Sequence, residues 1–286
     1  MSKVLFFTNS QHLLDDFRHR LTNEQIESTV SSYSDLDFTL DGESSSIKLS
    51  STGADLSDFD VIINISTPAH ELIHIHSSLA CYCRKKGVKI LDDTFTNTSG
   101  KLYEMWRLWE KDVPVPKTAF GNISHLSRKL IDFGGVGVLK ATHGSKGKEN
   151  YLVHSPEEIE QSLSDKNPYD YILQNFIPNT GDYRVVAFDY EPKLAIYRSA
   201  TGTDHRNNTS LGAQANVVEI TTELAQIAKA SAEALDIKFA GVDIITDKNT
   251  GANYVLEINR TPQFASGSFL NEKYAVLREY LRSLNI

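Results

Sequence analysis

The stretch FAGVDIITDKNTGANYVLEIN, residues 239–259, predicts two strands joined by a turn. The polar segment DKNTG, residues 247–251, ends in glycine and favours a hairpin. Glu257 and Asn259 lie two residues apart in YVLEIN, so both side chains point to one face of the strand. Pairing of the strands then brings Asp243 roughly level with Glu257.

Asp243, Glu257 and Asn259 together offer a set of hard oxygen atoms that suits Mg²⁺ completed by water and phosphate. Without a cation, neighbouring carboxylates repel each other. The alternative is a polar strand face that is exposed to water and binds nothing. The hairpin taken by itself leaves both interpretations open.

Two lysines indicate an anion site. Lys140 ends the apolar strand VGVLK, residues 136–140, where a charge needs a partner. Lys101 stands in the first turn of a predicted helix, the end that attracts anions. The alternative for each lysine is a solvated ammonium group on a stem that packs along the surface.

The segment HGSKGKEN, residues 143–150, joins two predicted strands and contains Gly144, Ser145 and Gly147. It is not a Walker loop, because Thr142 occupies the position of the first glycine. The neighbouring GGVGVLK, residues 134–140, lacks the third glycine and the helix of a dinucleotide motif. Backbone N–H groups of such a loop can close over phosphates, and a plain hairpin turn is the alternative.

The segment HELIH, residues 70–74, has the spacing of a zinc-protease helix. At 100° per residue, however, His70 and His74 fall opposite an apolar stripe. That stripe consists of Leu72, Ile75, Leu79, Tyr82 and Cys83. Ser77 and Ala80 occupy the glycine and histidine positions of the extended motif, so the third ligand that a catalytic zinc needs is missing. We expect a solvated helix face.

The composition narrows the class of protein. The 286 residues carry a net charge of −8, which argues against general binding to nucleic acid or to a membrane surface. The N-terminus does not resemble a signal peptide, and no apolar stretch approaches the ~20 residues that span a bilayer. We therefore expect a cytoplasmic protein. Cys81 and Cys83 are one residue apart, and we expect both to be reduced and structural.

The first part of the chain alternates strands with helices. KVLFF (3–7), DVIINI (60–65) and VKIL (88–91) are predicted buried strands, and SIKLS (46–50) is a short additional one. Helices are predicted after the first strand and from Pro68 to about Lys86. This order predicts a small parallel α/β lobe. Beyond Lys101 we expect a helix, antiparallel strands, and a second helix at 222–236.

The ordered motifs resemble one family. In sequence they are Lys101, VPVPKT, Lys140, GSKGK, LQNFI, GDYR, YRSATGTDHRNNTSLGA, AGVDII and EIN. This order resembles the ATP-grasp superfamily and is most similar to its RimK-type carboxylate–amine ligases, from about Asp60 to Phe264. The resemblance implies an α+β fold: a leading α/β domain at 1–95 and an ATP-grasp domain at 96–286. Its central lobe would cover about 101–173 and its C-terminal lobe about 174–286, with ATP held between them.

The resemblance also implies residue roles. Lys101 and Lys140 would contact the ATP phosphates under the loop at 144–148. The hinge, which comprises Gln174, Asn175, Phe176 and Ile177, would present backbone groups to adenine. Asp182 would lie near the ribose.

Arg206 and Arg198 would face the γ-phosphate and an acyl-phosphate intermediate by the same resemblance. Asp243, Glu257 and Asn259 match the family's Mg²⁺ ligands, which implies two ions with Mn²⁺ as a substitute. Two departures stand out. Asn175 replaces an acidic hinge residue, and RTPQFASG, residues 260–267, replaces a Ser-Pro-Gly turn beside the acceptor region.

The implied reaction is ATP-dependent amide formation between a carboxylate and an amine through an acyl phosphate. The acceptor stays open among amino acids, a peptide C-terminus, a protein tail and intramolecular ester or amide crosslinking, because one fold hosts many substrates. The resemblance favours a homo-oligomer. The alternatives are a small-molecule kinase on the same fold and a non-catalytic ATP-binding subunit.

Overall fold

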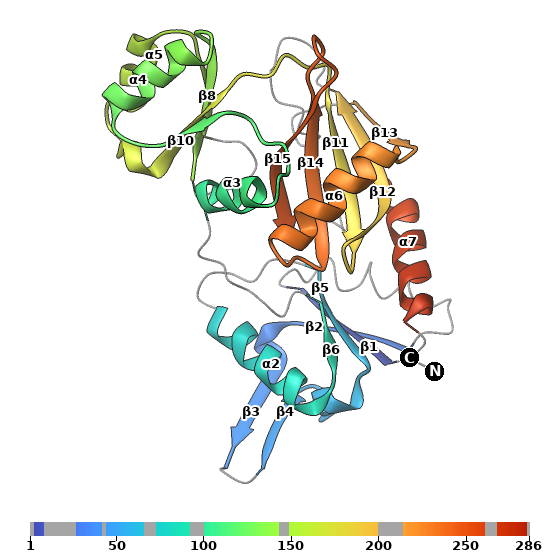
Figure 1. The fold of residues 1–286 in the computed structure, drawn as a ribbon. Helices are drawn as coiled ribbons and strands as arrows, with labels where there is room; N and C mark the ends of the chain where they lie inside the picture. The colour runs from blue at the N-terminus through green and yellow to red at the C-terminus, as the bar shows by residue number, and fades with distance from the viewer. Residues whose placement is uncertain are drawn as a thin grey trace. The chain divides into compact units, whose positions relative to one another are not determined.

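The computed structural model describes residues 3–8, 27–41, 44–65, 73–91, 100–142, 149–199, 214–260 and 268–284. The chain divides into two compact units (Figure 1). One consists of Met1–Asn97, Asp236–Ala240 and Arg260–Ile286, and the other of Thr98–Leu235 and Gly241–Asn259. The domain limit at 95/96 and the lobe limit near 173/174 stay predictions.

The first unit contains a parallel sheet with the strand order β2-β1-β5-β6. Its strands are β1 (Lys3–Phe7), β2 (Glu27–Ser31), β5 (Val61–Asn64) and β6 (Lys89–Ile90). The predicted strands KVLFF, DVIINI and VKIL are thereby confirmed. Strand β2, with the sequence ESTVS, lacks the continuous apolar run that predicted the other strands, and only its last two residues are buried.

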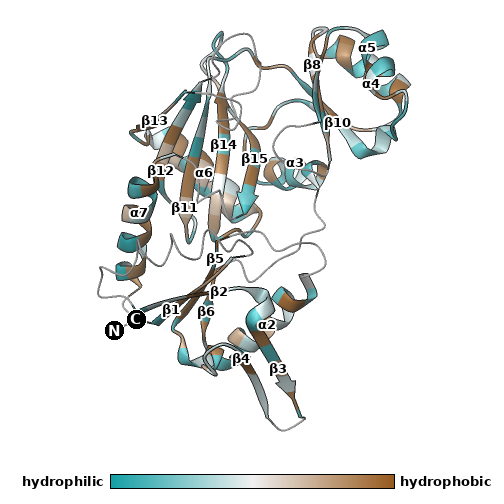
Figure 2. Cartoon of the chain, turned by 180° about the vertical axis from the view of Figure 1, so that it is seen from behind, coloured by the Kyte–Doolittle hydropathy of each residue, from teal (hydrophilic) through white to brown (hydrophobic). Residues whose placement is uncertain are grey.

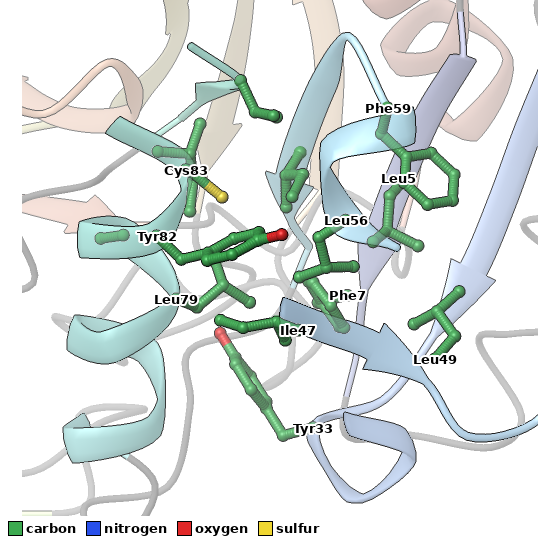
Figure 3. Packing of buried hydrophobic residues seen from close by; sticks show 14 residues of the cluster. Leu5, Phe7, Tyr33, Ile47, Leu49, Leu56, Phe59, Leu79, Tyr82 and Cys83 are labelled. Carbon is green, nitrogen blue, oxygen red and sulfur yellow. The ribbon is translucent and has the colours of Figure 1, made fainter. Parts of the chain in front are cut away.

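Helix α2 (Ile73–Lys86) covers the core of this sheet. Its buried residues Leu79, Tyr82 and Cys83 lie toward Leu5 and Phe7 (Figure 3). Burial of each such large apolar side chain stabilises the unit by about 1.5–3 kcal/mol. The predicted apolar stripe is therefore confirmed from residue 75 onward, while residue 72 lies outside the described residues.

The opposite face of α2 is exposed to solvent, as predicted. His74, Ser77 and Lys85 are exposed, whereas His70 and Glu71 lie outside the described residues. Among the residues described, no three His, Cys, Asp or Glu side chains gather into a metal-binding group. The buried histidine of this helix is His76, whose Nδ1 lies 2.8 Å from the hydroxyl of Tyr33.

A two-stranded antiparallel sheet extends from this unit (Figure 1). It pairs β3 (Leu36–Leu40) with β4 (Ser45–Leu49), and the short helices η1 (Tyr33–Asp35) and η2 (Leu56–Asp58) flank it. The predicted strand SIKLS corresponds to β4. Helix α7 (Leu270–Ser283) also belongs to the first unit. It buries Tyr274, Leu277 and Leu281.

The second unit begins with α3 (Lys101–Glu110) and an antiparallel sheet ordered β7-β10-β8-β9. Its strands are β7 (Thr118–Ala119), β8 (Gly137–Ala141), β9 (Asn150–Val153) and β10 (Tyr171–Asn175), with η4 (Pro168–Asp170) before the last. Helices α4 (Ile123–Asp132) and α5 (Pro156–Ser162) pack on this sheet. Side-chain caps at Asn122 and Ser155 start them, although neither helix was predicted.

The other sheet of this unit has the order β13-β12-β11-β14-β15. Its strands are β11 (Asp182–Phe188), β12 (Glu191–Ser199), β13 (Gln214–Val218), β14 (Phe239–Thr246) and β15 (Asn253–Arg260). Helix α6 (Thr222–Ala234) lies against it (Figure 1). The hydrophobic strands appear in brown in Figure 2, with β14 buried along nearly its whole length. None of the described helices is long and apolar enough to cross a membrane.

The two thiols should differ sharply in reactivity. Burial raises the pKa of the Cys83 thiol to about 12, whereas Cys81 is exposed. Because the thiolate is the reactive form, a disulfide reagent at pH 8 should modify one thiol per native chain and two after unfolding. Cys81→Ser should abolish the fast phase, and rapid modification of a second thiol in the native protein would contradict the packing.

Candidate functional site

The predicted metal ligands come together on strands β14 and β15. The amide nitrogen of Asn259 lies 3.1 Å from Glu257 Oε1 and 3.4 Å from Asp243 Oδ2. Asp243 is buried, and the other two side chains are half-buried. A half-turn of the Asn259 amide group would present its oxygen in place of the nitrogen. The three side chains therefore fit a cation that prefers oxygen ligands.

Two arginines hold Asp243. Arg184 on β11 donates from Nε and Nη2 to the two carboxylate oxygens, at 2.7 and 2.6 Å. Arg198 on β12 places Nη2 3.2 Å from Asp243 Oδ1 and donates from Nε to Asp182 Oδ1 at 2.8 Å. The four side chains are between 6 and 13% exposed. The negative charges of two carboxylates and the positive charges of two guanidinium groups thus balance in a region that is largely shielded from solvent.

This network sets the protonation of its acids. Burial alone would raise the pKa of Asp243, but Arg184 and Arg198 outweigh burial and lower that pKa to about 2. Asp182 has one close arginine, and burial prevails there, raising its pKa to about 6. Burial would lower the pKa of Arg198, yet the adjacent carboxylates raise it above its ordinary value. The Asp243 side chain is therefore an ionised carboxylate over the physiological range.

Lys140 belongs to the same electrostatic environment. It lies on β8 opposite Ile172 of β10. Burial lowers the pKa of its ammonium group to about 8, an effect that Glu257 and Asp243 partly oppose. Lys101, the first residue of α3, adds to the lowering. Lys140 thus interacts with a second lysine and with two carboxylates, a combination of charges that could bind a phosphate chain together with a cation.

The start of α3 is tied to the entry of the glycine loop. The N–H of Lys101 donates to the carbonyl of Thr142 at 3.1 Å, and the N–H of Thr142 donates to Asp170. Lys101 therefore lies beside the end of β8, as a shared anion site requires. The loop residues Gly144, Ser145 and Gly147 lie outside the described residues, as does Arg206.

The predicted hinge comprises the last two residues of β10 and the two residues that follow it. The N–H groups of Asn175 and Phe176 donate to the carbonyls of Lys117 and Val136, so they fix the hinge to its neighbours. Gln174 donates its amide to Thr118, while Gln174 Oε1 and Asn175 Oδ1 are buried without a hydrogen-bond partner. Ile177 is buried, and Phe176 is half-buried. Each orphaned acceptor is costly, and a ligand with N–H donors would satisfy the one that it faces.

The structure brings Asp182 and Arg198 together at the metal ligands. Their predicted roles, at a ribose and at an acyl phosphate, stay predictions. Arg184 is the site residue that sequence reasoning missed. Its signal is the spacing in GDYR, which puts Asp182 and Arg184 two apart on β11 and hence on one face.

The glycine before this strand has no room for a side chain. A Cβ at Gly181 would lie 2.3 Å from the carbonyl oxygen of Arg198 and 2.6 Å from the ring of Tyr197. Backbone must therefore move, and Gly181→Ala should lower the free energy of unfolding by about 1–3 kcal/mol, as overpacking does. Urea denaturation measures this. Gly53→Ala would give the separate cost of backbone strain without a close contact, because its φ is +74° and no atom lies within 4 Å of its added Cβ. An unchanged midpoint for Gly181→Ala would refute the close packing.

Comparison with known proteins gives consistent matches. A family model described as the RimK-like ATP-grasp domain matches residues 98–272. A tetrahydromethanopterin:alpha-L-glutamate ligase of Methanosarcina acetivorans is 28% identical, with 80% of this chain and 82% of that protein covered. The alpha-aminoadipate–LysW ligase LysX of Saccharolobus solfataricus is 30% identical, with 62% and 68% covered.

Among solved structures, the ATP-grasp ligase PsnB complexed with a minimal precursor, Mg and ADP has a similar fold. The TM-score is 0.75 at 13% identity, with 97% of this chain and 96% of that one covered. At this identity the likeness concerns the fold alone, and it confirms the predicted α+β architecture.

Proposed function

Since this chain belongs to the RimK-like ATP-grasp family, we propose that it joins a carboxylate to the amine of an acidic amino acid through an acyl phosphate. Its family and its relatives identify it as a carboxylate–amine ligase that uses ATP and Mg²⁺. The observation that supports the ATP-dependent chemistry is the convergence of Asp243, Glu257 and Asn259 beside Lys140 and two arginines, whereas the amine class rests on the relatives.

The residues present fit ATP and magnesium. Asp243, Glu257 and Asn259 would hold two Mg²⁺ ions, for which Mn²⁺ would substitute. Bound there, the cations supply charge neutralisation on the phosphate oxygens. Lys101 and Lys140 would add positive charge for the phosphates. Gln174 and Asn175 are consecutive in β10, so their side chains point to opposite faces, and one of their two unpartnered oxygens would suit the exocyclic amino group of adenine.

The reaction has two steps. An oxygen of the substrate carboxylate bonds to the γ-phosphorus of ATP as the bond to ADP breaks. The amine nitrogen then bonds to the acyl carbon, phosphate leaves with the electron pair, and the amine loses a proton. The side chains contribute by positioning and charge, so no protein nucleophile is needed. Arg206 would face the acyl phosphate, because a planar guanidinium binds phosphate bidentately. Arg198 would reach the acyl phosphate only by giving up its hydrogen bonds to Asp182.

The substrate class rests on the relatives. The names of both similar ligases contain an amino acid with a second carboxylate, namely glutamate or aminoadipate. We extend that amine class to this chain. The carboxylate partner is proposed to be a small molecule, peptide or protein tail.

The test is phosphate release from ATP and Mg²⁺ with pooled short peptides as carboxylates and amino acids as amines. Mass spectrometry of the products identifies any condensed species. Stimulation by glutamate or 2-aminoadipate, with a product equal to the two substrates less water, is expected. A stable phosphorylated product without free phosphate would instead show a kinase. Tight ATP binding without turnover on any acceptor would favour a non-catalytic subunit.

A further inference from the structure

Charged side chains from three adjacent strands meet on one face of the five-stranded sheet. Arg198 on β12 lies directly opposite Asp182 on β11 in the antiparallel ladder. Arg184 is two residues beyond Asp182 on the same face of β11, and it pairs with Asp243 on the next strand, β14. The pair formed by Asp182 and Arg198 therefore lies next to the proposed metal ligands without belonging to them.

Both oxygens of Asp182 bind Arg198. The Nε of Arg198 donates to Asp182 Oδ1 at 2.8 Å, and its Nη2 donates to Oδ2 at 2.5 Å. Such a two-point contact fixes the plane of the guanidinium group as well as its position. Gly181 allows the two strands to approach closely, because a Cβ there would lie 2.3 Å from the carbonyl oxygen of Arg198. The backbone and the side chains together thus define where this arginine lies.

The same arginine reaches one particular oxygen of Asp243. Arg198 Nη2 lies 3.2 Å from Asp243 Oδ1, which also accepts from Arg184 Nε at 2.7 Å. A carboxylate oxygen has about two acceptor positions, so both positions of Oδ1 are occupied. Oδ2 accepts from Arg184 Nη2 at 2.6 Å and from the amide of Asn259 at 3.4 Å. Because that amide also contacts Glu257, a half-turn of the Asn259 amide opens Oδ2 on the side of Glu257.

We propose that Asp182 is a positioning residue that holds Arg198 on Asp243 Oδ1, so that Oδ2 is left for the cation. The inference rests on the proposed binding of ATP and Mg²⁺, but not on the identity of the carboxylate or the amine. Without the charge of Asp182, Arg198 turns toward Asp243, the other carboxylate that it contacts. Two guanidinium groups then compete with the cation for the same two oxygens. This role differs from contact with the ribose.

The test is the affinity of the full chain for Mn²⁺ at saturating ADP, followed by electron paramagnetic resonance. Asp182→Asn keeps the size of the side chain and removes its charge. It should weaken Mn²⁺ binding about ten- to a hundred-fold, the range for loss of a group that orients a metal ligand. The double variant Asp182→Asn/Arg198→Met also removes the competing guanidinium group and strands no charge, so it should recover most of that loss.

The matched control removes an acid from an exposed ion pair. Asp132 on α4 pairs with Lys129 at 2.9 Å. Asp132→Asn removes the same charge as Asp182→Asn, and it should bind Mn²⁺ as the wild type does.

Two further measurements separate geometry from charge and from contact with the ribose. Arg198→Lys keeps the positive charge but lacks the planar fork that bridges two carboxylates, so Mn²⁺ binding should weaken. A parallel titration uses 2′,3′-dideoxy-ADP, which has no ribose hydroxyl groups. Asp182→Asn should weaken Mn²⁺ binding by the same factor with either nucleotide.

Wild-type Mn²⁺ affinity in Asp182→Asn would overturn the proposal even if the variant unfolds at lower urea concentration, because Asp182 would then have only a structural role. A double variant that binds Mn²⁺ as weakly as Asp182→Asn would also overturn it, as would wild-type affinity in Arg198→Lys. An effect of Asp182→Asn that disappears with the dideoxy nucleotide would assign Asp182 to the ribose instead. A wild-type chain that binds Mn²⁺ with ADP but forms no amide would contradict the proposed ligation and not this inference.

Discussion

The Glu257→Gln variant is expected to lose ATP-dependent amide formation by at least about a hundred- to a thousand-fold, the range for loss of a preorganised electrostatic contact. Glutamine keeps the size and one oxygen of the side chain but removes its negative charge. Asp243 is already neutralised by Arg184 and Arg198, whereas the Glu257 carboxylate contacts the amide of Asn259, so Glu257 supplies the less neutralised negative charge. A divalent ion and the phosphates it carries should therefore depend on Glu257 most.

The measurement is phosphate release against Mg²⁺ concentration, together with Mn²⁺ binding followed by electron paramagnetic resonance. The variant should bind Mn²⁺ more weakly in the presence of ADP and show an unchanged circular dichroism spectrum. Glu160→Gln is the matched control, because Glu160 is exposed on α5, and it should behave as wild type. Full activity of Glu257→Gln, or unchanged Mn²⁺ affinity, would remove the metal assignment.

The Arg198→Met variant is expected to lose about 3–5 kcal/mol of unfolding free energy at pH 8, the usual cost of stranding one member of a buried ion pair. Methionine retains the apolar part of the arginine side chain but removes its charge. Asp182, whose side chain is 7% exposed, then has no arginine to stabilise its carboxylate form. The double variant Asp182→Asn/Arg198→Met should recover part of this loss, because neither charge remains. The control is Arg128→Met, at an exposed position of α4, which should change the free energy of unfolding by less than about 0.5 kcal/mol.

The loss in Arg198→Met should also depend on pH. Burial raises the pKa of Asp182 to about 6 even with the arginine present. In the variant the folded chain therefore takes up a proton more readily than the unfolded chain, and its stability increases as the pH falls. Urea midpoints at pH 8 and pH 5 should show a smaller deficit at pH 5. An equal deficit at both values, or additive single variants, would contradict a charged buried pair.

Local patterns predicted most of the site. Glu257 and Asn259 follow from strand periodicity, and Asp243 follows from the turn that pairs the two strands. The most buried residues of β15, Val255 and Ile258, are three apart, so strict alternation is not kept there. The amide of Asn259 nevertheless reaches both carboxylates.

Contacts between distant segments could not be predicted in the same way. Arg184 meets Asp243 because β11 lies between β12 and β14, an order that no local pattern specifies. The hinge shows the same limit. The family resemblance implied backbone groups for adenine, and no local pattern predicted that the N–H groups of Asn175 and Phe176 donate to Lys117 and Val136, which are remote in the chain. In the fold, helices α4 and α5 and strand β2 were missed for lack of a recognised periodic signal.

The arginine pair on Asp243 has a consequence for the order in which ligands arrive. A divalent ion that comes alone approaches a carboxylate already neutralised by two guanidinium groups, with two lysines close by, and like charges repel strongly in a dry setting. Phosphate groups reverse that balance, because they bring the negative charge that the cations lack. The cation should thus enter together with the nucleotide, and in the absence of nucleotide the enzyme should bind the cation only weakly.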